Sequence, residues 1–175
     1  MYRHSLCAAL CALTLALSPA LALAQPPAAT KPAPKTAGKA VAKKATAGAA
    51  KTITIAAGDT MRFAPATIRA KAGSQVTVVL KSTSALPKVA MAHNFVLLKS
   101  GTDVPAFATA SATARDSNYI SPKLKAQVLA ATDMAGGGES VTVTFTAPTA
   151  PGKYTFICTF PAHFQSGMVG ILVVE

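Results

Sequence analysis

The sequence predicts an all-β domain, an antiparallel β-sandwich of seven to eight short strands with a short helical insertion. Two observations predict this fold class. Short segments in which polar residues alternate with β-branched or aromatic ones recur from residue 51 to residue 175. Turns that contain glycine separate these segments, and we find neither an internal repeat nor a long amphipathic helix.

The expected strands lie where this alternation is clearest. Residues 140–145 alternate at every position, whereas the apolar run at 169–174 is typical of a buried closing strand. Residues 103–118 are rich in Ala, Ser and Thr, and we expect a short helix there, packed outside the sandwich. The expected strands are 52–55, 67–70, 75–80, 94–98, 140–145, 153–157 and 169–174.

Residues 1–24 have the pattern of a secretory signal peptide. An apolar run from Leu6 to Leu17 follows a basic start, and Ala22-Leu23-Ala24 is a small-x-small cleavage pattern. A transmembrane anchor is the alternative, but the run is short for a bilayer. We therefore expect export to the periplasm, with Gln25 as the mature N-terminus.

Residues 25–50 are expected to form a disordered Ala/Pro/Lys-rich tether before the folded domain at 51–175. The formal charge of +11 loses Arg3 with the signal, and the remaining +10 divides into +5 on the tether and +5 on the domain. Such a tether is either a solubilising spacer or a contact for an acidic partner or membrane surface. Export and the lack of interleaved basic and aromatic residues argue against nucleic acid.

The signal segment carries two of the three cysteines and one of the three histidines. The mature chain would keep Cys158, His93 and His163. A single cysteine cannot form an internal disulfide, so its presence in an exported protein needs another explanation.

One loop between the last two expected strands contains Cys158, His163 and Met168, and His93 lies at another strand. A thiolate, two imidazoles and a distant thioether are the ligands of a trigonal copper site with a weak axial methionine. Each residue alone has an ordinary explanation, as a buried small side chain, a surface histidine or core packing. Their combination in one pattern predicts one copper ion that alternates between Cu(I) and Cu(II).

The chain resembles azurin-type cupredoxins, the blue copper proteins of the plastocyanin/azurin family, from about Thr52 to its end. The resemblance implies a Greek-key β-sandwich. The chain also differs from azurins. The loop from His163 to Met168 has one more residue, and the chain lacks tryptophan and the azurin disulfide. The matching positions are Asp59, Met61 and Phe63, the segment 86–94, and Cys158-Thr159-Phe160-Pro161 with His163.

The resemblance also implies roles around the metal. Ala92 stands where azurins have a glycine whose carbonyl approaches copper. The backbone N–H groups of Asn94 and Phe160 would donate to the Cys158 sulfur, and the Asn94 side chain would join the two ligand loops. Pro161 has no N–H and so adds no donor.

The function implied is transfer of single electrons between transient redox partners such as c-type cytochromes or oxidoreductases, by a monomer. The partner would meet an apolar patch around the His163 ring. The expected patch residues are Met61, Met91, Phe160, Pro161, Ala162 and Phe164.

Three alternatives differ in class. Cys158, His163 and Asn94 are the residue types of a papain-like protease, but Cys158 is expected to end a strand rather than begin a helix. Zinc rarely takes methionine. A copper carrier or storage protein is the main alternative, although the chain shows neither a Cys-x-x-Cys pair nor a methionine cluster.

Overall fold

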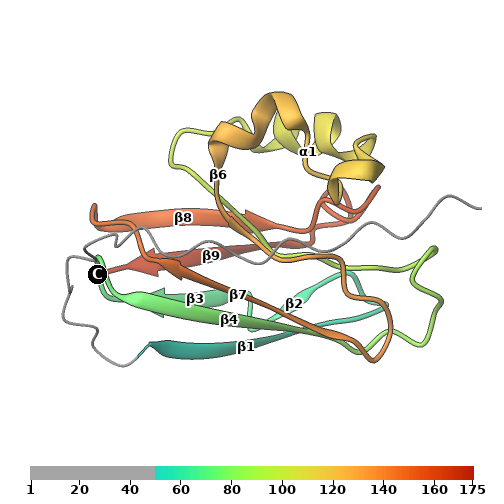
Figure 1. Ribbon diagram of the computed structural model, residues 1–175, viewed down its shortest axis with the longest axis horizontal. Helices are drawn as coiled ribbons and strands as arrows, with labels where there is room; N and C mark the ends of the chain where they lie inside the picture. The colour runs from blue at the N-terminus through green and yellow to red at the C-terminus, as the bar shows by residue number, and fades with distance from the viewer. Residues whose placement is uncertain (1–49) are drawn as a thin grey trace, which may run out of the picture. The chain divides into compact units, whose positions relative to one another are not determined.

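The computed structural model describes residues 50–175, which form two β-sheets packed face to face (Figure 1). The predicted signal peptide at 1–24, and all but the last residue of the tether predicted at 25–50, lie outside the described residues. No helix within residues 50–175 is long and apolar enough to cross a membrane.

The first sheet has the strand order β2-β1-β4-β7. β1 pairs in parallel with β4, and the other two pairs are antiparallel. Its strands are β1 (Lys51–Ala57), β2 (Phe63–Ala64), β4 (Gln75–Ser82) and β7 (Ser140–Thr146).

The second sheet has the order β3-β9-β8-β5-β6. β3 pairs in parallel with β9, and the remaining pairs are antiparallel. Its strands are β3 (Thr67–Ala70), β5 (Val96–Leu98), β6 (Val128–Ala131), β8 (Gly152–Ile157) and β9 (Val169–Val174).

The predicted two-sheet sandwich is confirmed, with three differences in detail. The pairing is mixed rather than wholly antiparallel, because the chain crosses between the sheets through β2 and β3 before β4 returns beside β1. β5 begins at Val96 instead of residue 94. Two strands were not predicted, since β2 has only two residues and the Val-Leu-Ala-Ala of β6 does not alternate.

Alternating side chains of both sheets fill the space between them. In β4, every second residue from Val76 to Ser82 is buried, as expected for a strand with one face on the core. The rings of Phe95 and Phe63 pack against Phe156 with centroids 4.8 and 5.1 Å away. These aromatic contacts supply a large apolar core in a chain without tryptophan.

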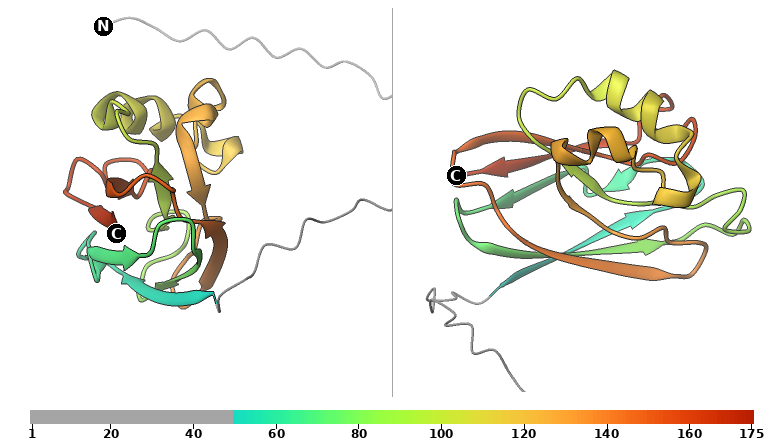
Figure 2. Two further views of the ribbon diagram at one scale, coloured as in Figure 1. Left: turned by 90° about the vertical axis from the view of Figure 1, so that its left-hand side faces the viewer. Right: turned by 45° about the horizontal axis from the view of Figure 1, so that its top comes forward.

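A helical layer covers the outer face of the second sheet (Figure 2). It consists of α1 (Val104–Ala112), capped by the Asp103 carboxylate, and two 3-10 helices, η1 (Arg115–Ser117) and η2 (Pro122–Gln127). β5 is therefore buried on both sides, with Leu97 in the inter-sheet core and Val96 and Leu98 under the helices. This double burial explains why the sequence of β5 does not alternate between polar and apolar residues. The predicted outer helix is present as α1.

The loops that follow β1, β4, β6 and β8 gather at one end of the sandwich, opposite the C-terminus (Figure 1). The β4–β5 and β8–β9 loops contain all four predicted metal ligands. The fold thus brings residues that are far apart in the sequence to one end of the two sheets.

Candidate metal centre

The β8–β9 loop is closed at its base by its own backbone. Cys158 immediately follows β8, and its N–H donates to the Met168 carbonyl at 3.2 Å, just before β9 begins. The Met168 N–H donates to the His163 carbonyl at 2.9 Å, and the His163 N–H to the Phe160 carbonyl at 3.1 Å. These bonds fix Cys158, His163 and Met168 relative to one another.

His93 is held by a separate backbone anchor. It lies before β5 in an isolated bridge with Ala135. The His93 N–H donates to the Ala135 carbonyl at 2.9 Å, and the His93 carbonyl accepts from the Ala135 N–H at 2.8 Å. The glycines that follow allow the His93 loop to pack closely, because a Cβ on Gly137 would lie 2.4 Å from the Ser84 carbonyl oxygen. The sequence pattern of this glycine run indicates only a turn.

The structure brings three of the four predicted ligands together. His93, Cys158 and His163 are all buried, and their ligand atoms lie within 4.8 Å of one another. The Cys158 Sγ is 3.4 Å from His163 Nδ1 and 4.0 Å from the Ala92 carbonyl oxygen. Met168 is fully buried in the same apolar cluster as Cys158. The Ala92 carbonyl therefore faces the site, as its position suggested.

Two opposing effects act on the pKa of the Cys158 thiol. Burial raises the pKa of the Cys158 thiol to about 12, because a thiolate loses its hydration inside the protein. Hydrogen bonds from the backbone N–H groups of Asn94 and Phe160 lower that pKa in part. These two donors are the ones expected from sequence, and they favour the thiolate that a metal ion requires.

His93 has no partner for either ring nitrogen within the described residues, although both atoms are buried. An unsatisfied buried polar atom costs about 1–3 kcal/mol, so such an atom usually has a function. Beside a buried thiol and a second imidazole, an unpartnered imidazole nitrogen fits a metal ligand. A soft sulfur donor with two imidazoles and a nearby thioether suits copper among the common metals.

The metal-free protein is expected to lose stability as the pH falls from 6.5 toward 4. Burial, and then the neighbouring His93, lower the pKa of His163 to about 4 from its usual 6.5. Below pH 6.5 the unfolded chain takes up this proton first, so His163 contributes stability above pH 6.5 that is lost between pH 6.5 and 4. The loss is about 3 kcal/mol, or roughly 10 °C in Tm.

Calorimetry of the metal-free protein across this pH range would measure the effect. The copper-loaded protein should resist the same acidification until lower pH, because bound metal competes with the proton for the imidazole. A flat Tm for the metal-free protein between pH 6.5 and 4 would contradict the burial of a neutral His163.

Asn94 joins the two ligand loops through its side chain. Its Nδ2 donates to Thr159 Oγ1 at 2.8 Å, and its Oδ1 accepts from the Thr159 N–H at 2.9 Å. Nδ2 also donates to the Asn118 carbonyl at 3.2 Å, which ties in the helical layer. The roles of Thr159 and Asn118 were not predicted, since polar residues in loops give no sequence signal for a particular partner.

Arg62, whose role was not predicted from the sequence, supports the β8–β9 loop from the β1–β2 loop. Its guanidinium donates to the Met61 carbonyl at 2.8 Å and to the Ser166 carbonyl. A Cβ on Gly167, which has φ +93°, would approach this guanidinium to 3.2 Å. Arg62 therefore supports the stretch between His163 and Met168.

We expect Arg62→Ala to loosen the ligand loop without removing the metal, because no ligand is changed. Loss of the Ser166 and Met61 bonds should cost about 1–2 kcal/mol of unfolding free energy. Hydrogen exchange of the Gly167 amide should become faster while the amides of β4 keep their protection. Arg62→Lys, which keeps the charge, is the matched control. Equally fast exchange in both variants would assign the effect to the lost guanidinium hydrogen bonds, and wild-type exchange in Arg62→Lys would assign it to charge.

The expected electron-transfer patch is partly exposed. Pro161 and Ala162 are exposed, and the other four members are half-buried. Phe160 packs toward the inter-sheet core and Phe164 toward the helical layer, so the two rings hold opposite sides of the loop. His163 itself is only 3% exposed.

Comparison with known proteins supports copper as the metal of this centre. The sequence model of copper binding proteins of the plastocyanin/azurin family matches residues 49–175. Auracyanin-A of Chloroflexus aurantiacus is 37% identical over 116 residues, which cover 66% of this chain and 68% of that protein. Auracyanin-B of the same organism is 46% identical over 83 residues, 47% of this chain but only 35% of that protein.

A solved structure described as auracyanin A, a "blue" copper protein, superposes with a TM-score of 0.65 at 37% identity. The match covers 73% of this chain and all of that one. Fold and donor set together define a β-sandwich protein that binds one copper ion. The chain belongs to the plastocyanin/azurin family of copper-binding proteins, as its resemblance to azurins indicated.

Proposed function

We propose that this protein is an exported carrier of single electrons, with a type 1 copper site held by His93, Cys158, His163 and Met168. The observation that carries the proposal is the buried cluster in which a thiol and two imidazoles meet within 4.8 Å while both His93 nitrogens lack partners. When bound, copper supplies a centre that changes oxidation state by one electron.

The protein's own residues prepare this exchange. Cys158 provides a thiolate whose charge is stabilised by the Asn94 and Phe160 N–H groups. The Asn94–Thr159 bonds and the His93–Ala135 bridge hold the ligands in a fixed arrangement. A rigid, buried ligand set changes little when charge is added or removed, which keeps the reorganisation cost of electron transfer low.

The burial of the ligands argues against catalysis by the cysteine. A nucleophilic cysteine needs exposure and a lowered pKa, whereas Cys158 is fully buried with a raised pKa. Cys158 also follows a strand rather than beginning a helix. These features support a carrier rather than an enzyme.

Copper storage or delivery is the second candidate. A protein that hands on its metal needs accessible ligands, but the three clustered ligands here are at most 3% exposed and the loop is closed by backbone bonds. This closure favours a site that keeps its copper. The expected monomeric state, the export signal and the basic tether as a contact for a membrane surface or acidic partner remain part of the proposal.

Visible spectroscopy with redox titration tests the function. We expect the Cu(II) protein to be intensely blue, to bleach with one electron per molecule, and to recover its colour on reoxidation. Repeated cycles in the presence of a Cu(I) chelator should leave the copper in place. Rapid loss of copper to the chelator would favour delivery, and a colourless Cu(II) form would contradict the site.

A further inference from the structure

A surface hollow of about 300 Å³ lies directly beside the metal centre. It is formed by the β4–β5 loop, η1 and the turn that follows it, the β6–β7 loop and the β8–β9 loop. Its lining residues are Lys88, Val89, Ala92, Arg115, Tyr119, Met134 and Phe160.

Two of these lining residues contact the ligand sulfur. The Ala92 carbonyl oxygen is 4.0 Å from Cys158 Sγ, and the Phe160 N–H hydrogen-bonds to the same sulfur. A group seated in the hollow would therefore be separated from Cys158 by a single layer of residues.

Packed aromatic rings also connect the hollow to the ligand His163. The Tyr119 ring lies 5.2 Å from Phe160, and Phe160 lies 4.8 Å from His163, centroid to centroid. Tyr119 and Phe160 are both half-buried, so part of each ring faces outward. The hollow is thus in contact with the metal centre through packed rings as well as through the sulfur's neighbours.

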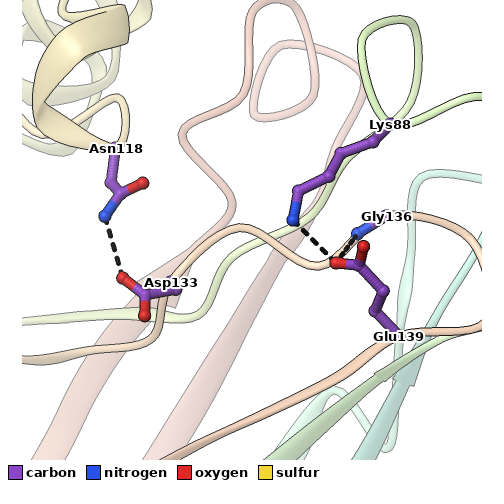
Figure 3. Close-up of polar contacts among 5 residues, drawn as sticks. All are labelled: Lys88, Asn118, Asp133, Gly136 and Glu139. Atoms are coloured by element: carbon purple, nitrogen blue, oxygen red, sulfur yellow. Dashed lines mark hydrogen bonds and ion pairs between the residues drawn. The ribbon is translucent and has the colours of Figure 1, made fainter.

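The hollow is cationic. Lys88 and Arg115 line it, and no carboxylate does. Lys88 pairs with Glu139 at 2.7 Å, with both side chains about half exposed, and Asp133 is bonded to the Asn118 side chain (Figure 3). Arg115 has no ion pair within residues 50–175, although Asp116 follows it in sequence.

An apolar rim adjoins these charges. Val89 is 76% exposed, and Leu86 in the same loop is 45% exposed. A cationic hollow with exposed aliphatic neighbours matches a protein surface that carries carboxylates around an apolar centre.

We propose that this hollow is a second electron-transfer contact, which receives carboxylate side chains of an acidic redox protein. The inference rests on the proposed electron-carrier function and adds a partner class to it. Arg115 is the principal attracting charge, with Lys88 in support, and the Ala92 and Phe160 walls place the partner's redox group near Cys158. This contact adjoins the apolar patch at His163, with which it shares Phe160, and differs from it in its charged residues.

Charge reversal at the hollow tests the proposal. The probe is cytochrome c whose surface lysines have been succinylated, an acidic one-electron protein. At low ionic strength we expect Arg115→Glu to slow its bimolecular electron exchange about tenfold or more and to flatten the salt dependence. The visible spectrum should not change, because Arg115 contacts no ligand.

Lys71→Glu is the matched control, since it changes net charge equally. Lys71 is exposed and follows β3, whose last residue pairs with Val174 at the end of β9 away from Met168. We expect it to slow the acidic probe by less than threefold. Unmodified cationic cytochrome c should not be slowed by Arg115→Glu, and Arg115→Gln, a milder change, should give an intermediate effect with the acidic probe.

Equal slowing of the acidic probe by Arg115→Glu and Lys71→Glu would overturn the inference. Electron self-exchange, measured by NMR line broadening in mixtures of the two oxidation states, separates this result from failure of the proposed function. If electron self-exchange is normal and both variants slow exchange with the acidic probe equally, only the proposed contact at the hollow is rejected. Absence of self-exchange and of exchange with either cytochrome rejects the carrier function together with the contact.

Discussion

Replacing Cys158 by serine is expected to remove the intense visible absorption of the copper-loaded protein completely. The colour of such a site comes from charge transfer between a thiolate sulfur and Cu(II), and a hydroxyl has no comparable transition. Serine is also a weaker and harder donor, so copper affinity should fall at least a hundredfold. Absorption spectra and competition with a copper chelator measure both effects.

The folded state should survive this change. Serine is close to cysteine in size, and the Asn94 and Phe160 N–H groups that bond to the sulfur can bond to its oxygen. Burying the hydroxyl where the thiol is fully buried should cost about 1–2 kcal/mol of unfolding free energy. Thermal unfolding of the metal-free variant checks that loss of colour is not loss of fold.

Met168→Gln is the comparison variant for Cys158→Ser. We expect the Met168 thioether to contribute little to copper affinity, so this variant should keep its copper and its strong absorption. Its reduction potential should be lower, because an oxygen donor favours Cu(II). Strong blue colour in Cys158→Ser would show that the thiolate is not a ligand, and complete copper loss in Met168→Gln would show that Met168 is not a weak one.

The sequence predicted the strands that follow a regular period and the residues whose chemistry is rare. Alternation located β4 and β7 because each has one face on the inter-sheet core. It could not locate β2 or β6, which are too short or too uniform to show a period. β5 was found from its β-branched and apolar residues, but its start was misplaced because it is buried on both faces.

The candidate site was predictable for a different reason. Residues 25–175 contain one cysteine and two histidines, and Met168 lies in the same loop as the cysteine, so few arrangements were open. The supporting contacts were not predictable in the same way. Arg62 reaches Ser166 across 104 residues of sequence, and Ser84 reaches Asp59 across 25, so only the fold shows that they meet.

The glycines at 136 and 137 illustrate the limit of local interpretation. Glycine-rich runs are typical of turns, and residues 136–139 do form one, with Glu139 N–H donating to the Gly136 carbonyl at 3.0 Å. The structure adds a second requirement, the close approach of the His93 loop to Gly136 and Gly137. A local pattern can indicate the turn, but the need for space against Ser84 and Lys88 arises only from packing.

A negative charge at Ala162 is expected to slow electron self-exchange by at least tenfold at low ionic strength. Ala162 is exposed beside His163 at the tip of the ligand loop, within the proposed apolar contact patch. Two molecules that meet through this patch would bring two such charges together. Their repulsion, and the cost of removing each carboxylate from water, should both disfavour the contact.

The backbone at this position allows a well-matched control. Ala162 has φ 68°, in the left-handed region where Asn and Asp are tolerated better than most residues. Ala162→Asp and Ala162→Asn therefore place side chains of the same size in the same backbone conformation and differ in charge. The visible spectrum and reduction potential should change little in either, because residue 162 donates no ligand.

NMR line broadening in mixtures of reduced and oxidised protein measures the self-exchange rate of each variant. Ala162→Asn should retain most of the wild-type rate, whereas Ala162→Asp should lose it and recover in part at high salt, which screens the repulsion. Wild-type self-exchange rates in both variants would place the contact away from the His163 loop. If both fell equally, bulk at position 162, rather than charge, would be the cause, because the two side chains differ in charge but not in size.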